Sequence, residues 1–338
     1  MSAPKAGSEA LLEVEDLRVD FTVREGTLQA VRGVSFAVQP GRVLGIVGES
    51  GSGKTVSALA IMGLLPRSAR VRGSVRYRGQ ELLGTSDAEM SGVRGVDLAM
   101  IFQDPMTSLN PVHTVGGQVA EAVLTHEDVS KKEAMERAVA LLAIVGIPKP
   151  AQRAKGYPHE LSGGMRQRAV IAMAMANAPD VIIADEPTTA LDVTVQAQVL
   201  EALEKAQEET GAAIVLITHD LGVVAGLADD VVVMYAGRLV ERAPVDDLYE
   251  HPRMPYTLGL LGALPRADTD GQPLTPIEGA PPSLVGLPPG CPFSPRCTLS
   301  RPACQAAEPG LRPVRGDAHL AACHFSEELV DGAGAAPS

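Results

Sequence analysis

A glycine-rich loop between an apolar run and a helical pattern constrains this chain more than any other feature. The pattern G-x-x-x-x-G-K-[ST] is met by Gly48-Glu49-Ser50-Gly51-Ser52-Gly53-Lys54-Thr55. Val43–Val47 predicts a buried strand before the loop, and Val56 to Leu65 predicts a helix that Pro66 ends. This order is typical of the phosphate-binding loop of NTPases, whereas a glycine-rich turn with a chance Lys-Thr would need neither flanking element.

Phosphate binding explains why these residue types stand at these positions. Glycines let backbone N–H groups point at phosphate oxygens, and the helix N-terminus adds its positive dipole end. Lys54 supplies a charge for the β- and γ-phosphates, and Thr55 supplies a hydroxyl for Mg²⁺. The predicted phosphate-binding residues are Gly48, Ser50, Gly51, Ser52, Gly53, Lys54, Thr55 and Val56.

Composition limits the class of protein. The chain has 338 residues, 45% of them hydrophobic, which is enough for one large domain or two smaller ones. Its net charge of −12 argues against non-specific binding to nucleic acid, which needs a basic surface. No apolar run approaches the roughly 18 residues of a membrane span, and Met1 to Ala10 lacks the order of a signal peptide. We therefore expect a cytosolic protein, or one attached to a membrane only through partners.

Strand patterns alternate with helical patterns along most of the chain. Strand signals occur in 11–47, 71–83, 96–102, 181–186, 213–218 and 231–235. Helical spacing occurs in 114–146 and in the two segments that Ser162 and Asp192 would cap. The alternation predicts an α/β core with a parallel sheet. From Pro252 to Pro313 the chain is dense in proline and glycine, which indicates an irregular appended domain.

Two carboxylates end the strand predicted at 181–186. Asp185, at the end of a buried strand in a chain with a phosphate loop, is placed to hold Mg²⁺. Glu186, one step further on, can polarise an attacking water. A strand end that merely needs two charges for solubility is the alternative.

A Ser-Gly-Gly run begins the helix that precedes this strand. Ser162, Gly163 and Gly164 offer a hydroxyl and backbone N–H groups to an anion. Alone such a run is usually a turn, but here it stands about 20 residues before Asp185 and Glu186. Together, this run, the phosphate loop and the Asp-Glu pair resemble the ATP-binding subunit of an ABC transporter.

The resemblance implies roles for further residues. Gln103 matches the Q-loop glutamine, Asp192 lies in a match to the D-loop, and His219 matches the switch histidine. Phe21 stands where the family has an aromatic ring that stacks on adenine, and a core position is its alternative. The fold implied is a P-loop NTPase of ABC type, with a β-rich subdomain, a parallel-sheet core, a helical subdomain and an irregular C-terminal extension.

The family mechanism maps onto the chain residue by residue. ATP would lie on the phosphate loop of one subunit and be closed over by the Ser-Gly-Gly run of a facing subunit, so hydrolysis needs two subunits head to tail. The catalytic residues implied are Glu186 as the base, His219 beside the γ-phosphate, Lys54 and Gln103. The ligands implied for Mg²⁺ are Thr55, Gln103 and Asp185.

Two runs are similar to those of oligopeptide, dipeptide and nickel importers. They are Gln103 to Pro111 and His251 to Thr257, the second departing from the usual pattern at Met254. The implied partners are two transmembrane permease subunits, a paralogous ATPase and an extracytoplasmic solute-binding protein, with this chain on the cytoplasmic face of the cell membrane. Peptide import is the leading hypothesis. Import of nickel or another small solute, a soluble ABC ATPase without transport, and a redox-sensing module are the alternatives.

The domain organisation expected has four parts. A disordered N-terminus, 1–10, precedes an ATP-binding domain, 11–250, whose helical subdomain spans about 104–178. An importer-type extension follows at 251–328, and 329–338 is expected to be a disordered tail.

The extension holds all the cysteines, with the spacing C-x5-C-x6-C-x18-C: Cys291, Cys297, Cys304 and Cys323. The spacing lacks Cys-x-x-Cys and so differs from zinc ribbons and from ferredoxin runs. In a reducing compartment such a cluster favours metal over disulfides. Family members with four cysteines here resemble iron–sulfur proteins, so we expect a structural [4Fe–4S] cluster. One Zn²⁺ or no metal are the alternatives, and His319 and His324 are alternative ligands.

Overall fold

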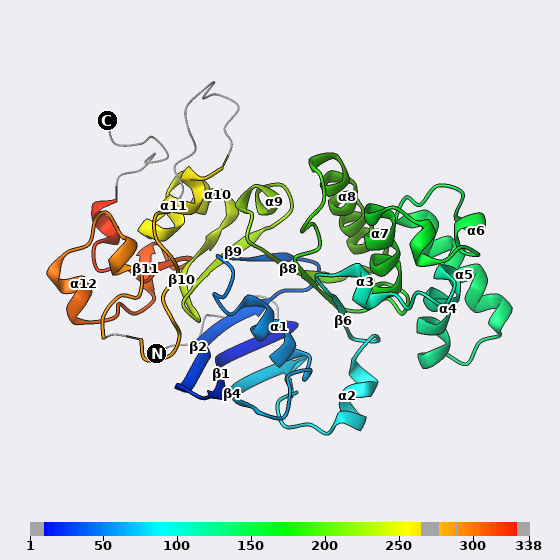
Figure 1. The fold of residues 1–338 in the computed structure, drawn as a ribbon, viewed down its shortest axis with the longest axis horizontal. Coiled ribbons are helices and arrows are strands. Elements are labelled where there is room, and N and C mark those ends of the chain that lie inside the picture. Colours follow the sequence, from blue (N-terminus) through cyan, green and yellow to red (C-terminus); the bar gives the residue numbers. More distant parts are fainter. Residues whose placement is uncertain (1–9, 265–276, 288, 330–338) are drawn as a thin grey trace. The chain divides into compact units, whose positions relative to one another are not determined.

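The computed structural model describes residues 10–264, 277–287 and 289–329 (Figure 1). The chain divides into two compact units. The first comprises Met1–Leu12, Ala37–Val43 and Tyr77–Ile217, and the second comprises Glu13–Phe36, Leu44–Arg76 and Thr218–Ser338. The disordered segments expected at 1–10 and 329–338 lie outside the described residues, apart from Ala10 and Leu329.

Parallel strands form the centre of the first unit. They are β6 (Leu98–Ile101), β7 (Val181–Asp185) and β8 (Ala213–Thr218). β7 pairs in parallel with both neighbours, with Ala184 opposite Ile101 on one side and Leu216 on the other. Every residue of β7 and β8 is buried, which explains their continuous apolar pattern.

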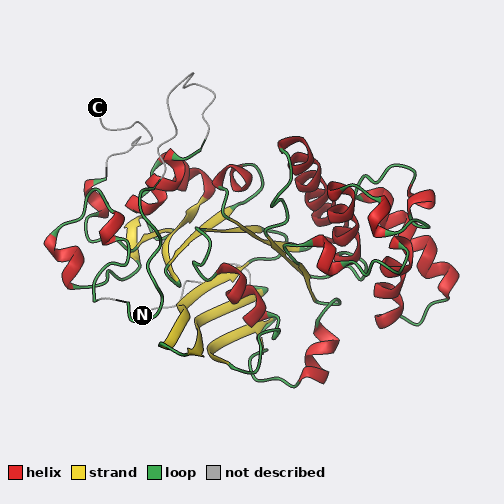
Figure 2. Cartoon of the chain, in the orientation of Figure 1, coloured by secondary structure: helices red, strands yellow, loops and turns green. Residues whose placement is uncertain are grey.

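Helices make up most of the rest of this unit (Figure 2). They are α2 (Asp87–Val93), α3 (Pro105–Ser108), α4 (Val115–His126), α5 (Lys131–Ile144), α6 (Pro150–Arg153), α7 (Gly163–Ala174) and α8 (Val193–Thr210), with the 3₁₀ turn η1 (Pro158–Glu160) and the short strand β5 (Gln80–Glu81). Ser162 and Asp192 cap α7 and α8, as their patterns predicted, because each side chain accepts a backbone N–H three residues on.

The second unit contains two groups of strands. One has the order β2-β1-β4 and the other the order β11-β12-β10-β9-β3. Their bounds are β1 (Leu12–Val23), β2 (Gly26–Val38), β3 (Val43–Val47), β4 (Ala69–Tyr77), β9 (Asp230–Tyr235), β10 (Arg238–Pro244), β11 (Arg312–Arg315) and β12 (His319–Ala321). β3 pairs in parallel with β9, and the three strands beyond β9 pair antiparallel.

The helices of the second unit are short. They are α1 (Lys54–Ile61), α9 (Leu221–Ala225), α10 (Val245–Glu250), α11 (Pro255–Gly262) and α12 (Pro302–Ala306), with the 3₁₀ turns η2 (Ser294–Arg296) and η3 (Ser326–Glu328). α1 ends four residues before the predicted Leu65, because Gly63 takes the left-handed conformation at φ +62°.

The extension contains strands that its irregular sequence did not indicate. β12 pairs with β10, and β11 pairs with β12 at the outer edge. An edge position tolerates Pro313, which has no N–H to donate. In the part of the chain that the structure describes, no helix is long and apolar enough to cross a membrane.

Candidate ATP-binding site

The predicted phosphate loop joins β3 to α1 in the second unit, and its glycines are required by close packing. A Cβ atom on Gly48 would lie 2.2 Å from the carbonyl oxygen of Met234, and one on Gly53 would lie 2.5 Å from that of Ala30. Gly53 also holds φ +102°, which L side chains rarely adopt. The loop therefore takes this path only with glycine at both positions.

The polar groups of the loop fit a phosphate ligand. Lys54 is 4% exposed, and its ammonium donates to the carbonyl oxygens of Gly48 at 2.6 Å and Glu49 at 3.0 Å. Ser52 Oγ is buried and has no hydrogen-bond partner within the described residues. A buried hydroxyl without a partner is costly, so this group is suited to pair with a bound phosphate oxygen. Ser50, Gly51 and Thr55 are exposed.

Gln103 and Glu186 come together in the first unit for a topological reason. They follow β6 and β7, which are parallel, so their strands end at the same edge. Gln103 Nε2 donates to Glu186 Oε2 at 3.1 Å. The preceding carboxylate, Asp185, is 2% exposed.

The Glu186 carboxylate is held by a second donor that the sequence did not point out. Thr189 Oγ1 donates to the same Oε2 atom at 2.8 Å. The Glu186 backbone has φ +47°, and its N–H donates to the Ile217 carbonyl at 2.8 Å. A non-glycine residue held at positive φ costs conformational energy and is often found at functional sites. In the sequence, only the position of Thr189, three residues after Glu186, could have indicated this contact.

The Ser-Gly-Gly run begins α7, and its residues have different structural roles. Ser162 is exposed and accepts the Met165 N–H at 3.3 Å. A Cβ atom on Gly164 would lie 2.3 Å from Val195 Cγ1, so this glycine allows α7 to pack on α8. Gly163 is exposed, as is Asp192 at the start of α8.

The remaining predicted residues belong to the second unit. His219 is exposed and precedes Asp220, whose carboxylate caps α9 by accepting the Gly222 N–H at 2.8 Å. Phe21 is partly exposed on β1. The candidate residues thus form two sets: the phosphate loop, Phe21 and His219 lie in one unit, and the Gln103–Glu186 pair, Asp185, Ser162 and Asp192 lie in the other.

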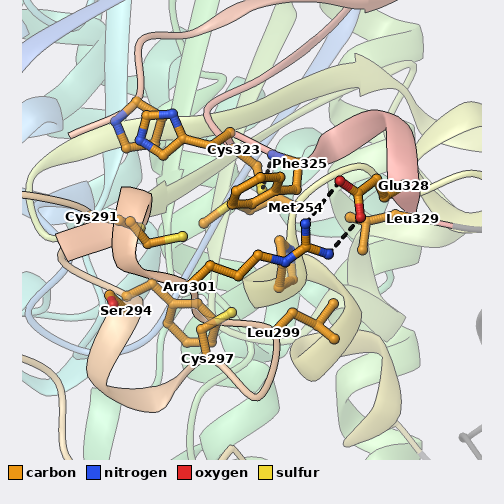
Figure 3. A pocket seen from close by; sticks show the side chains of 15 residues that line it. Met254, Cys291, Ser294, Cys297, Leu299, Arg301, Cys323, Phe325, Glu328 and Leu329 are labelled. Carbon is orange, nitrogen blue, oxygen red and sulfur yellow. Dashed lines mark hydrogen bonds and ion pairs between the residues drawn. The ribbon is translucent and has the colours of Figure 1, made fainter. Parts of the chain in front are cut away.

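The four cysteines line one pocket of the extension (Figure 3). Phe293, Leu299 and Phe325 add apolar surface, and the Arg301 side chain crosses the pocket toward Glu328. Burial raises the pKa of Cys291 to about 11 and also raises the pKa values of Cys297 and Cys323. The fold thus brings the four cysteines together at one pocket.

The prediction that this segment holds a [4Fe–4S] cluster is wrong. Among the described residues, no group of three or more His, Cys, Asp or Glu side chains could hold a metal ion, so the Zn²⁺ alternative is overturned as well. The physical reason is the chemistry of the pocket. Metal ligation needs thiolates, and burial makes deprotonation of Cys291, Cys297 and Cys323 less favourable. The Arg301 side chain also crosses the pocket that the cysteines line, so it takes up space there.

The two histidines named as alternative ligands have other partners. His319 is fully buried, and its Nε2 lies 2.8 Å from Glu241 Oε1. His324 Nε2 lies 2.9 Å from the carbonyl oxygen of Ala307. These contacts fasten the last strand and the last turn of the extension to the rest of the second unit.

Comparison with known proteins identifies the family. A family model described as "ABC transporter" matches residues 31–189, and one described as "Oligopeptide/dipeptide transporter, C-terminal region" matches residues 240–304. The chain is 52% identical over 325 residues to the dipeptide transport ATP-binding protein DppD of Bacillus subtilis, covering 96% of this chain and 97% of that protein. The chain therefore belongs to the ABC transporter family of ATP-binding proteins, in the group that carries this C-terminal region.

Two further similarities agree with this assignment. The oligopeptide transport ATP-binding protein OppD of Mycobacterium tuberculosis is 58% identical over 328 residues, 96% of this chain, but the chain spans only 53% of that relative's length. A solved dimeric, post-hydrolysis structure of the ATP-binding cassette MJ0796 bound to ADP and Pi has a TM-score of 0.62 and 26% identity, covering 69% of this chain and 98% of that one. The predicted ABC-type fold is confirmed.

Proposed function

We propose that this chain is the ATP-hydrolysing subunit of an ABC importer that carries peptides across the cytoplasmic membrane. One observation carries the proposal: a single chain combines an ABC transporter match with the C-terminal region of oligopeptide and dipeptide transporters. Relatives named for dipeptide and oligopeptide transport match nearly its whole length. Solute specificity would lie in the permease and binding protein, not in this chain.

ATP binding would use the phosphate loop of the second unit. Lys54 would pair with the β- and γ-phosphates, the buried Ser52 hydroxyl would find a partner there, and Phe21 would stack on adenine. Thr55, Asp185 and Gln103 would hold Mg²⁺. When bound, Mg²⁺ neutralises charge on the phosphate oxygens, and it needs only one or two protein carboxylates beside them.

Hydrolysis would depend on Glu186. Its carboxylate accepts hydrogen bonds from Gln103 and Thr189 through Oε2, and so is oriented before the reaction. Glu186 would orient or deprotonate the water whose oxygen attacks the γ-phosphorus, while the bond from that phosphorus to ADP breaks. His219 would contact the γ-phosphate.

A second ATPase subunit would complete the site. Ser162, Gly163 and Gly164 of the facing subunit, with its Asp192, would close over the γ-phosphate, and Ser162 and Gly163 are exposed as this role requires. We infer that the facing subunit is a paralogue. The complex would contain two permease subunits and receive solute from an extracytoplasmic binding protein, with this chain on the cytoplasmic face and no nucleic acid partner.

Affinity purification from detergent-solubilised membranes tests the proposal. We expect two permease chains and one paralogous ATPase to co-purify with the wild-type chain, and the ATPase of the reconstituted complex to rise with loaded peptide-binding protein. If the binding protein stimulates the ATPase when loaded with nickel and not with peptide, the solute is nickel. Recovery from the soluble fraction with ribosomal proteins and no permease would indicate a non-transport ATPase.

A further inference from the structure

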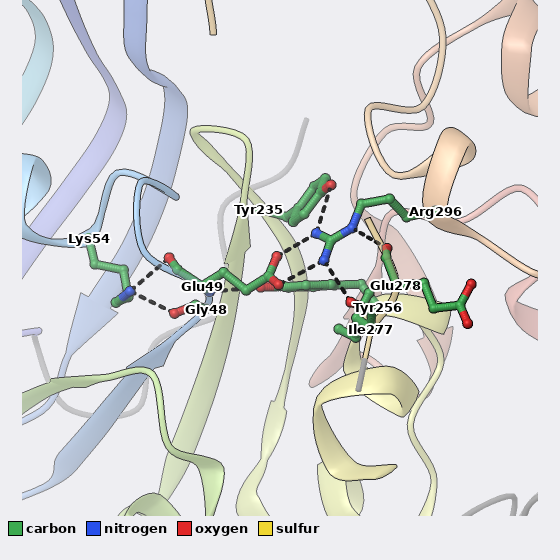
Figure 4. A network of polar contacts seen from close by, with 8 residues as sticks. All are labelled: Gly48, Glu49, Lys54, Tyr235, Tyr256, Ile277, Glu278 and Arg296. Atoms are coloured by element: carbon green, nitrogen blue, oxygen red, sulfur yellow. Dashed lines mark hydrogen bonds and ion pairs between the residues drawn. The ribbon is translucent and has the colours of Figure 1, made fainter. Parts of the chain in front are cut away.

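A side chain of the C-terminal extension reaches the phosphate loop within the second unit. Arg296, at the end of η2, forms a bidentate ion pair with Glu49, the loop residue after Gly48 (Figure 4). Arg296 Nη1 lies 2.6 Å from Glu49 Oε2, and Nη2 lies 2.9 Å from Oε1. The two residues are 247 positions apart in the sequence.

Every N–H group of the Arg296 guanidinium donates a hydrogen bond. Beyond Glu49, Nε donates to the Glu278 carbonyl at 3.0 Å, Nη2 to the Ile277 carbonyl at 3.3 Å and Nη1 to Tyr235 Oη at 3.4 Å. A guanidinium has five N–H groups, and all five point to one of these acceptors. Its side chain is 5% exposed, and hydrogen bonding to Glu49 raises the pKa of Arg296. This arginine therefore stays charged and has one geometry.

The backbone of Glu49 is held from the same side. Its N–H donates to Tyr256 Oη at 2.8 Å, and Tyr256 is fully buried on α11. The rings of Tyr235, Tyr256 and Phe293 contact one another, with centroids 4.5 to 5.3 Å apart. Glu49 is thus bound to the extension by its main chain, through Tyr256, and by its side chain, through Arg296.

Charge gives this arrangement a consequence for nucleotide binding. A carboxylate one residue from Gly48 would repel the triphosphate that the loop binds, since like charges within a few ångströms oppose each other. The paired guanidinium cancels that charge and directs the carboxylate into the extension (Figure 4).

We propose that Arg296 is a positioning residue for nucleotide binding: it neutralises Glu49 and keeps its carboxylate turned toward the extension instead of toward the bound triphosphate. The extension is then part of the ATP site, and its loss would weaken nucleotide binding. The inference rests on nucleotide binding at the loop and not on which solute is transported.

The test measures the Kd of AMP-PNP with Mg²⁺, by calorimetry, on four full-length proteins: wild type, Arg296→Met, Glu49→Gln and the double variant. We expect Arg296→Met to raise the Kd about tenfold, because the carboxylate is left unpaired beside the phosphates. The double variant removes that charge and should return the Kd to within about threefold of wild type. The Arg296→Met defect should also shrink in 0.5 M salt, about three times physiological ionic strength, since repulsion is screened.

A matched control separates positioning from folding. Arg301→Met breaks the bidentate pair that Arg301 makes with Glu328 in the same extension, away from the loop, and should leave the Kd unchanged. If Arg296→Met does not fold, Arg296→Lys keeps the charge without the bidentate geometry and should give an intermediate Kd. The proposal is overturned if Arg296→Met or Arg296→Lys binds like wild type, or if the double variant binds as weakly as Arg296→Met. The proposal is also overturned if the wild-type protein does not bind AMP-PNP, and that result would overturn the proposed ATPase function as well. If the wild-type protein binds AMP-PNP and the Arg296 variants bind equally well, only the role of Arg296 is overturned.

Discussion

Thr189 and Gln103 donate to one and the same oxygen of Glu186, Oε2, at 2.8 and 3.1 Å. Both donors belong to the first unit, and the positive φ of Glu186 directs its backbone out of the strand path. A carboxylate that accepts these two hydrogen bonds is oriented before a water molecule approaches it. This relationship gives the first two predictions.

Glu186→Gln should bind ATP with unchanged affinity and hydrolyse it about 10² to 10⁴-fold more slowly, because an amide cannot accept the proton of water. The amide still occupies the same space, so the fold should be retained. Phosphate release at saturating MgATP, beside equilibrium binding of the nucleotide, checks this. Wild-type turnover in the variant would remove Glu186 as the base.

Thr189→Val should lower kcat about three- to tenfold with little change in Kd, because it deletes a hydrogen bond that orients the Glu186 carboxylate. Thr189→Ser keeps the hydroxyl and is the matched control. Single-turnover hydrolysis of both variants separates chemistry from binding. Equal rates for the Val and Ser variants would show that this hydrogen bond does not orient the carboxylate.

Gly164→Ala should lower the free energy of unfolding by about 1–3 kcal/mol, since its Cβ would overlap Val195 Cγ1. Gly92→Ala, in α2, meets no atom within 4 Å and should raise stability by about 0.4–1 kcal/mol. Urea denaturation of the two variants gives the comparison. Adding Val195→Ala to Gly164→Ala should recover part of the loss, and no recovery would assign the cost to something other than this contact.

Alkylation of Cys291 by iodoacetamide should accelerate about tenfold per pH unit from pH 7 to 10 without levelling, because its pKa is raised to about 11 and only the thiolate reacts. In urea the rate should level off above about pH 8.5, the ordinary thiol pKa. Peptide mass spectrometry after timed labelling measures both. The folded pKa lies above the unfolded one, so the stabilising contribution of the neutral thiol is complete below about pH 8.5 and is lost as the pH rises toward 11. A plateau below pH 9 in the folded protein would contradict the effect of burial.

Local patterns explain why part of the site was predictable from sequence. The strand, loop and helix around Lys54 are encoded within one short segment. The meeting of Gln103 and Glu186 follows from two parallel strands that end at one edge. Caps such as Ser162 and Asp192 act on N–H groups only three residues away.

The rest depends on contacts between distant residues, which a single sequence does not encode locally. The sequence shows Arg296 only as the residue before Cys297, and the contact with Glu49 arises from the fold. The cysteine spacing indicated a cluster, but the burial of the thiols and the path of the Arg301 side chain across their pocket come from tertiary packing. The same holds for β11 and β12, whose short runs acquire strand structure by pairing with β10.

ATP-driven uptake of a labelled tripeptide into proteoliposomes tests the central claim most directly. The vesicles would contain the complex purified through this chain. The solute-binding protein and the labelled peptide would be added outside, and ATP would be enclosed inside. We predict uptake that requires ATP and disappears when this chain carries Glu186→Gln. Peptide uptake that is equal with wild type and Glu186→Gln, or wild-type ATP hydrolysis without peptide uptake, would contradict the account.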